Sequence, residues 1–111
     1  MDYSLALRNF LNDEGLLRQM PARHRLRAHV YLWAAQGLEV GRRYTENEIN
    51  GHIQRILAFR DPVTIRRALV DYGFLDRTPN GSAYWLREVQ PTLQDLVPEP
   101  RPPITCGEEG N

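Results

Sequence analysis

Residues 44–85 contain the stretch that decides the fold. They open with YTENEI at 44–49, continue with DPVTIRRALVDYGFLDR at 61–77 and close with NGSAYW at 80–85. The pattern predicts a capped helix, a short turn, a second helix ended by glycine, and a tight hairpin. Helix, turn, helix and wing in this order are the layout of winged-helix modules, which most often bind DNA.

The first helix of this pair has a clear start signal. Thr45 stands as the N-cap and Glu48 follows three residues later, so each side chain can satisfy an otherwise unpaired backbone amide. Tyr44 and Ile49 occupy the two positions of a hydrophobic staple. We expect the buried stripe to continue through Ile53, Ile56 and Leu57.

The second helix of the pair begins with Asp61 as its cap and Pro62 as its first residue. Gly73 is its expected left-handed stop. Helical spacing places Ile65, Ala68, Leu69 and Tyr72 on the inward face. The opposite face carries Thr64, Arg67 and Asp71.

Two strands are predicted after this helix, at residues 74–77 and 83–86. Asn80-Gly81 between them is expected to supply the positive φ angles of a tight hairpin turn. Side chains alternate along a strand, so Tyr84 and Trp85 should lie on opposite faces.

The N-terminal part predicts two more helices. A short one runs from Ser4, its cap, to about Leu11, and a longer one from Ala22 to Gln36, with Gly37 as its stop. Residues 16–20 between them are expected to be extended. The buried stripe of the longer helix should consist of Leu26, Val30, Trp33 and Ala34.

Length and composition favour one small α+β domain with a tail. A chain of 111 residues suits a single domain, which we place at residues 1–90. Residues 91–111 hold five of the eight prolines and several acids, and are predicted to form a mobile, partly extended tail. The single cysteine, the absence of any membrane-length apolar run and the acidic N-terminus favour a cytoplasmic protein without a secretory signal.

Charge is unevenly distributed along the chain. The net charge is zero, yet residues 16–90 hold 12 arginines against 7 acidic residues, a balance of +5. All basic residues are arginine, whose guanidinium group binds phosphate bidentately, so the body suits a nucleic-acid surface. Codon bias in a GC-rich genome is the competing explanation for the missing lysines.

Five blocks of sequence carry a resemblance to a known family: DEGLL at 13–17, MPAR at 20–23, GRRYTENEIN at 41–50, IRRALVDYGFLDR at 65–77 and GSAYW at 81–85. Through these blocks the chain resembles, from Phe10 to Trp85, an uncharacterised bacterial family, domain of unknown function 2087. The resemblance implies a helix-turn-helix-like fold and a place behind DNA-binding regulator domains, but no activity or ligand. Such a domain could also sense, dimerise or dock.

The candidate site is a double-stranded DNA surface on the second helix of the pair and the hairpin. Thr64 and Arg67 would point at base edges, and Arg60 and Arg66 would lie near phosphates. Arg77 flanks the wing, while Arg42 and Arg43 precede the first helix of the pair. The alternative is structural: Arg67 would pair with Asp71, and Arg66 or Arg77 with Asp61, Asp71 or Asp76.

Other chemistry has little support in the sequence. The three histidines lack a metal-binding spacing, and Cys106 has no basic neighbour to activate it. There is no phosphate-binding glycine loop or nucleophile turn, so we expect neither an enzyme nor a cofactor. A transcription-regulatory DNA-binding module is therefore the leading interpretation. The alternative is a protein-interaction or homodimerising module that uses Trp85, Phe74 and the basic helix start.

Overall fold

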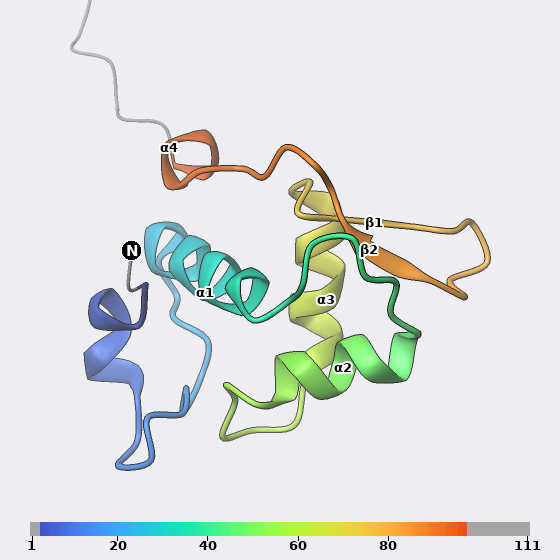
Figure 1. Ribbon diagram of the computed structural model, residues 1–111. Helices are drawn as coiled ribbons and strands as arrows, with labels where there is room; N and C mark the ends of the chain where they lie inside the picture. The colour runs from blue at the N-terminus through green and yellow to red at the C-terminus, as the bar shows by residue number, and fades with distance from the viewer. Residues whose placement is uncertain (1–2, 98–111) are drawn as a thin grey trace, which may run out of the picture.

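Helix α1 (His24–Gln36) packs against η1 (Tyr3–Phe10) on one side and against α3 (Pro62–Asp71) on the other (Figure 1). A computed structural model describes residues 3–97, which form a small α+β fold of five helices and one two-stranded antiparallel sheet. The remaining elements are α2 (Glu46–Gln54), β1 (Leu75–Arg77), β2 (Tyr84–Leu86) and α4 (Leu93–Leu96).

Helix α1 is buried around most of its circumference, not along a single stripe. Val30 and Ala34 are buried as predicted, but Leu26 and Trp33 are only partly buried. The cause is that η1, α3 and α4 all contact α1, so residues on several sides lose solvent. The added buried positions are Ala28, His29, Tyr31, Leu32 and Ala35.

The start of α2 confirms the predicted capping box. Thr45 Oγ1 accepts a hydrogen bond from the Glu48 amide at 3.1 Å, and Glu48 Oε1 accepts one from the Thr45 amide at 2.8 Å. Tyr44 and Ile49, the staple residues, are both buried. The helix ends at Gln54, so Leu57 is buried beyond its end, where the chain pairs with the extended segment at Leu17.

Helix α3 begins as predicted, because the Asp61 side chain accepts a hydrogen bond from the Thr64 amide and Pro62 opens the first turn. Gly73 has a φ of +89°, the left-handed conformation expected after the helix. Ile65 and Leu69 are fully buried. Tyr72 was expected to face inward and is instead 41% exposed, with its ring stacked on Tyr31 at a centroid distance of 5.4 Å.

The hairpin pairs Leu75 with Leu86 and Arg77 with Tyr84. The predicted turn is wrong in one detail: Gly81 has a positive φ of +73°, but Asn80 does not. The loop is longer than a two-residue turn, and Thr78 Oγ1 organises it by accepting bonds from the amides of Ser82 and Ala83. Tyr84 is buried while Trp85 is partly exposed, which confirms the expected alternation.

The segment before α2 is joined to the hairpin through one residue. Tyr44 and Tyr84 exchange two backbone hydrogen bonds of 2.8 Å, an antiparallel bridge at the edge of β2. This bridge holds the hairpin against the beginning of α2, as Figure 1 shows where the chain passes beside β2.

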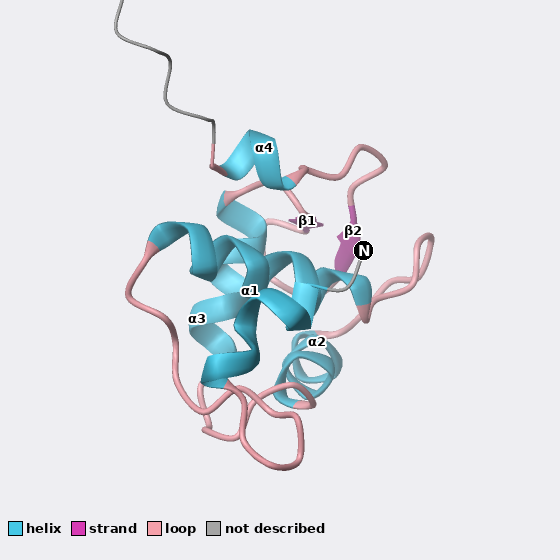
Figure 2. Ribbon diagram, turned by 90° about the vertical axis from the view of Figure 1, so that its left-hand side faces the viewer, coloured by secondary structure: helices cyan, strands magenta, loops and turns pink. Residues whose placement is uncertain are grey.

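Residues 93–96 form a short helix, where the sequence predicted an extended tail. Leu96 is buried against the fold, and His24 Nε2 of α1 donates a hydrogen bond to its carbonyl oxygen at 3.0 Å. Thr92 and Asp95 form a second capping box that starts this helix. The packed region thus extends past residue 90 (Figure 2). Residues 98–111 lie outside the described part, and their predicted mobility stays a prediction.

Candidate nucleic-acid interface

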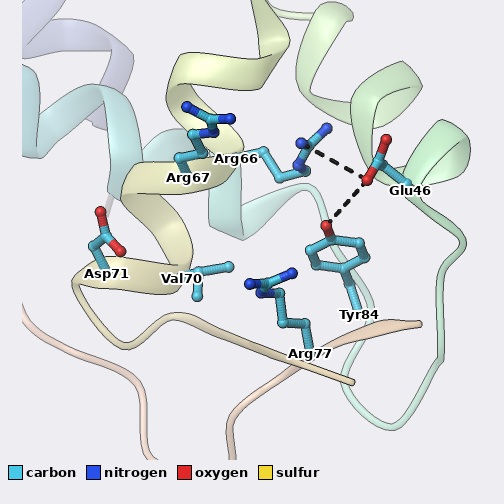
Figure 3. Close-up of a pocket in the computed structure, with 7 residues that line it drawn as sticks. All are labelled: Glu46, Arg66, Arg67, Val70, Asp71, Arg77 and Tyr84. Carbon is cyan, nitrogen blue, oxygen red and sulfur yellow. Dashed lines mark hydrogen bonds and ion pairs between the residues drawn. The ribbon is translucent and has the colours of Figure 1, made fainter. Parts of the chain in front are cut away.

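A pocket of about 490 Å³ lies between α3 and the hairpin, and we call it the α3–hairpin pocket (Figure 3). Helix α3 forms one wall, the two strands form another, and the first residue of α2 closes the third side. The pocket is lined by Glu46, Arg66, Arg67, Val70, Asp71, Arg77 and Tyr84.

Arg66 is buried and held by α2, so it is not placed at the outer surface where a phosphate contact was predicted. Its Nη1 donates a hydrogen bond to Asn50 Oδ1 at 2.7 Å, and its Nη2 lies 3.8 Å from Glu46 Oε1. Tyr84 stands beside this pair, and its hydroxyl donates to the same Glu46 oxygen at 3.4 Å. Helical rotation of about 100° per residue turns Arg66 towards α2 and away from the exposed face of α3.

Arg67 and Arg77 are exposed, and both line the pocket (Figure 3). Among residues 3–97, no ion pair involves either guanidinium group, so the structural pairing of Arg67 with Asp71 is not formed. The two side chains come from different elements, α3 and β1, and both border the α3–hairpin pocket. Together with the buried Arg66, they are the predicted site residues that line this pocket.

Arg60 and Thr64 lie at the outer end of α3. Arg60 is exposed just before the cap residue Asp61, and no ion pair within the described part of the chain includes it. The Thr64 hydroxyl donates to Asp61 Oδ2 at 2.7 Å, so only its acceptor lone pairs are open to a ligand. Thr64 and Arg67, one turn apart, form an exposed stripe on α3, and the exposed Arg60 lies just before the helix.

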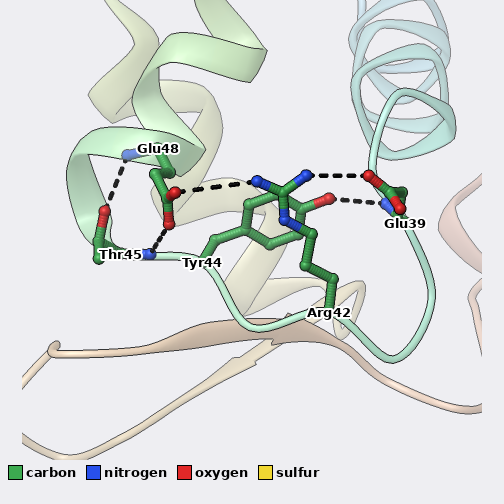
Figure 4. A network of polar contacts seen from close by, with 5 residues as sticks. All are labelled: Glu39, Arg42, Tyr44, Thr45 and Glu48. Carbon is green, nitrogen blue, oxygen red and sulfur yellow. Dashed lines mark hydrogen bonds and ion pairs between the residues drawn. The ribbon is translucent and has the colours of Figure 1, made fainter.

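Arg42 belongs to a polar network that supports the start of α2 (Figure 4). Its guanidinium group bonds Glu39 at 2.9 Å, lies 3.8 Å from Glu48 and covers the Tyr44 ring at 4.7 Å. The hydrogen bond to Glu39 raises the pKa of Arg42. The Thr45 amide, which donates to the carboxylate, lowers the pKa of Glu48. Arg42 therefore has a structural role that the sequence did not reveal.

Arg43 lies on the outer face of the hairpin. Its guanidinium carbon is 4.4 Å from the centroid of the Trp85 ring, a cation–π contact between the segment before α2 and β2. The residue remains exposed, so this contact orients the guanidinium group without removing it from solvent. It stands on the opposite side of β2 from Tyr84 and the α3–hairpin pocket.

Sequence reasoning missed Glu46, Asn50 and Tyr84 as partners of the arginines. One signal was available, because Glu46 and Asn50 are four residues apart and so share one face of α2. Nothing in the sequence indicated that this face would meet Arg66. The contact depends on how α2 packs against α3, which local spacing does not specify.

The histidines are engaged separately. His29 is buried, and its Nδ1 donates to the Arg25 carbonyl oxygen at 2.8 Å, while the His52 ring meets Tyr44 edge-on. Within residues 3–97, no three potential metal ligands gather at one place. No helix of the same region combines the length and apolar character needed to cross a membrane.

Comparison with known proteins gives one match. A family model described as an uncharacterized protein conserved in bacteria, domain of unknown function 2087, matches residues 16–86. That range contains the α3–hairpin pocket and all seven predicted site residues, and it confirms the resemblance seen in the sequence. No curated protein and no solved structure matches the chain significantly.

Proposed function

We propose that this chain, which belongs to the bacterial family of domain of unknown function 2087, binds double-stranded DNA as a winged-helix module of transcription regulation. The observation that carries the proposal is the pair Arg67 and Arg77. Both guanidinium groups are exposed beside α3 and the hairpin without an acidic partner in the described residues.

The arrangement of elements supports this function. Helices α2 and α3 pack on each other, the hairpin follows directly, and the Tyr44 bridge adds a short third segment to the sheet. In a helix-turn-helix complex the second helix enters the major groove. Here that helix is α3, whose exposed stripe would present Thr64 and Arg67 to the groove, with Arg60 just before the helix.

The arginines divide into two roles under this proposal. Arg67 would read a base edge, where an arginine–guanine pair gives about 1–3 kcal/mol of discrimination. Arg43, Arg60 and Arg77 would neutralise backbone phosphates and so contribute affinity without sequence preference. Arg42 and Arg66 would have structural roles, because their guanidinium groups bond the side chains of Glu39 and Asn50.

Fluorescence anisotropy of a labelled random-sequence duplex, titrated at one low and two higher salt concentrations, tests the proposal. We expect a micromolar dissociation constant at low salt. The logarithm of the association constant should fall linearly with the logarithm of salt concentration. Arg67→Ala should weaken binding severalfold and leave the melting temperature unchanged, since its side chain makes no ion pair in the described fold. Arg55→Ala, at the exposed end of α2, is the matched control. Absence of binding at low salt refutes a DNA function.

A protein-interaction module is the second candidate, and one observation favours it. Val40 is 79% exposed and lines a hollow of about 410 Å³ together with Trp85 and Leu86. An exposed apolar side chain beside an aromatic ring is typical of a docking or dimer surface. Sedimentation velocity over a range of concentrations tests dimerisation. A dimer that Val40→Asp abolishes without lowering the melting temperature supports this reading, and a monomer throughout argues against self-association.

A further inference from the structure

The α3–hairpin pocket gathers three guanidinium groups from two walls. Arg67 enters from α3 and Arg77 from β1, while Arg66 lies at the inner wall, fixed there by its hydrogen bond to Asn50 (Figure 3). Arg67 and Arg77 are therefore free to adjust to a ligand, whereas Arg66 is already oriented. The same pocket is lined by two carboxylates, Glu46 and Asp71, so its three cations exceed its anions by one. Because Arg67 and Arg77 are exposed, their side chains can turn towards a bound anion.

The acidic residues of the pocket do not cancel these charges. Glu46 is engaged by Arg66 and by the Tyr84 hydroxyl. Asp71 lies across Val70 from Arg77 in Figure 3, and it makes no ion pair with Arg67. The space between Arg67 and Arg77 is thus open to an external anion, with the Val70 side chain as an apolar part of its wall.

We propose that the α3–hairpin pocket binds a phosphate group clamped between Arg67 and Arg77. Guanidinium groups bind phosphate oxygens through paired, charge-assisted hydrogen bonds, and a terminal phosphate carries close to two negative charges at neutral pH. A volume of about 490 Å³ holds more than a phosphate, so an attached organic group also fits.

Two sources could supply this phosphate: the backbone of bound DNA, or a free phosphate monoester. The DNA source rests on the proposed function, because it requires α3 and the hairpin to lie on a duplex, and it would give Arg67 a backbone phosphate in place of a base edge. The monoester source does not, and it would make the pocket an effector site next to the same helix. Competition between the two would then follow, since both would use Arg67 and Arg77.

NMR spectra of the arginine Nε–Hε groups in the full chain distinguish the sources. The probes are adenosine monophosphate, adenosine as the phosphate-free control, and a short random-sequence duplex. We expect a phosphate-bearing probe to shift the Arg67 and Arg77 signals and leave the Arg55 signal in place. Adenosine should shift none of them.

Variants locate the binding. Arg67→Gln and Arg77→Gln should each lower affinity for the phosphate probe about tenfold, which is the loss of one charge-assisted contact. Asp71→Asn should raise affinity, because it removes a negative charge from the pocket wall. Arg55→Gln should have no effect, and melting temperatures identify any variant that has lost its fold.

The outcomes separate this inference from the DNA proposal. Monophosphate binding without duplex binding supports the pocket and refutes the DNA function. Shifts caused only by the duplex, and weakened by both glutamine variants, support the pocket and assign its phosphate to the DNA backbone. Duplex binding that both glutamine variants leave unchanged refutes the pocket and keeps the DNA function. Unshifted Arg67 and Arg77 signals with every probe refute the pocket outright.

Discussion

Arg66 and Arg67 follow each other in α3, yet their guanidinium groups lie in different environments. Arg66 faces α2 and bonds Asn50, while Arg67 faces solvent along the outer stripe. The same residue type therefore contributes to folding at one position and is available to a ligand at the next. An assignment of function by residue type alone would have treated them as equivalent.

Arg66→Ala should destabilise the fold by roughly 1–3 kcal/mol, because Asn50 and Glu46 would lose their hydrogen-bond or ion-pair partner. The measurement is urea unfolding followed by circular dichroism. Arg67→Ala is the control at the neighbouring position and should change the unfolding free energy little. Equal losses for the two variants would contradict the division of roles between them.

The stability of the fold should depend on pH through Glu48. Its folded-state pKa is lowered by the Thr45 amide, so the stabilisation is present above the ordinary glutamate pKa of about 4.3 and is lost as pH falls through the lower folded value. The urea concentration at the unfolding midpoint, measured from neutral pH to about pH 3, should therefore decrease as the pH becomes acidic. The Glu48→Gln variant has no carboxyl group to titrate at this position. If the difference in unfolding free energy between variant and parent does not shrink on acidification, Glu48 is not the cause of the pH dependence.

At the scale of elements, the sequence predicted the starts of helices better than their burial. The capping contacts of Thr45 with Glu48 and of Asp61 at the start of α3 join residues at most three positions apart. Such local contacts can be predicted from the sequence of one segment. Burial around α1 depends on three other elements that meet it from different sides. For the same reason the burial of Leu26, Trp33 and Tyr72 was overestimated.

The seven residues of the candidate site lie on the elements where the sequence placed them, but the partners of their side chains were not predicted. All of the seven proposed residues lie on α3, on the hairpin, or in the segments just before α2 and α3. The partnership of Arg66 with Asn50 joins residues sixteen positions apart, and the engagement of Arg42 with Glu39 depends on a loop conformation. Neither could be obtained from periodicity, which describes one element at a time.

Helix α4 should contribute to stability even though it has only four residues. Leu96 is buried against α1, so Leu96→Ala should lower the unfolding free energy by about 2 kcal/mol, near the lower end for a buried leucine. Thermal and urea unfolding would measure the change. Gln94→Ala, at an exposed position of the same helix, is the control. An unchanged unfolding free energy for Leu96→Ala would show that residues 91–97 belong to the tail that the sequence predicted.

For the whole molecule, the distribution of charge should control the affinity for nucleic acid. The basic body carries a balance of +5, whereas residues 98–111 contain three glutamates and one arginine. If those glutamates compete with phosphate for the arginines, deletion of residues 98–111 should raise duplex affinity at low salt, and the gain should shrink as salt rises. Anisotropy titrations measure both effects.

The deletion has a matched control of unchanged length. Replacing Glu99, Glu108 and Glu109 by glutamine removes the negative charges and keeps the chain. A charge effect predicts the same gain in affinity from this variant as from the deletion. A deletion that leaves duplex affinity unchanged would exclude competition by the acidic end.

The Tyr44 bridge gives the molecule a mechanical connection across its sequence. Tyr44 is hydrogen-bonded to β2 through its backbone, and its hydroxyl accepts a bond of 2.8 Å from the Glu39 amide just beyond α1. A force that tilts the hairpin would therefore pull on the loop after α1 and on the first turn of α2 together. Displacement of the hairpin would be transmitted to the loop after α1 through one buried tyrosine.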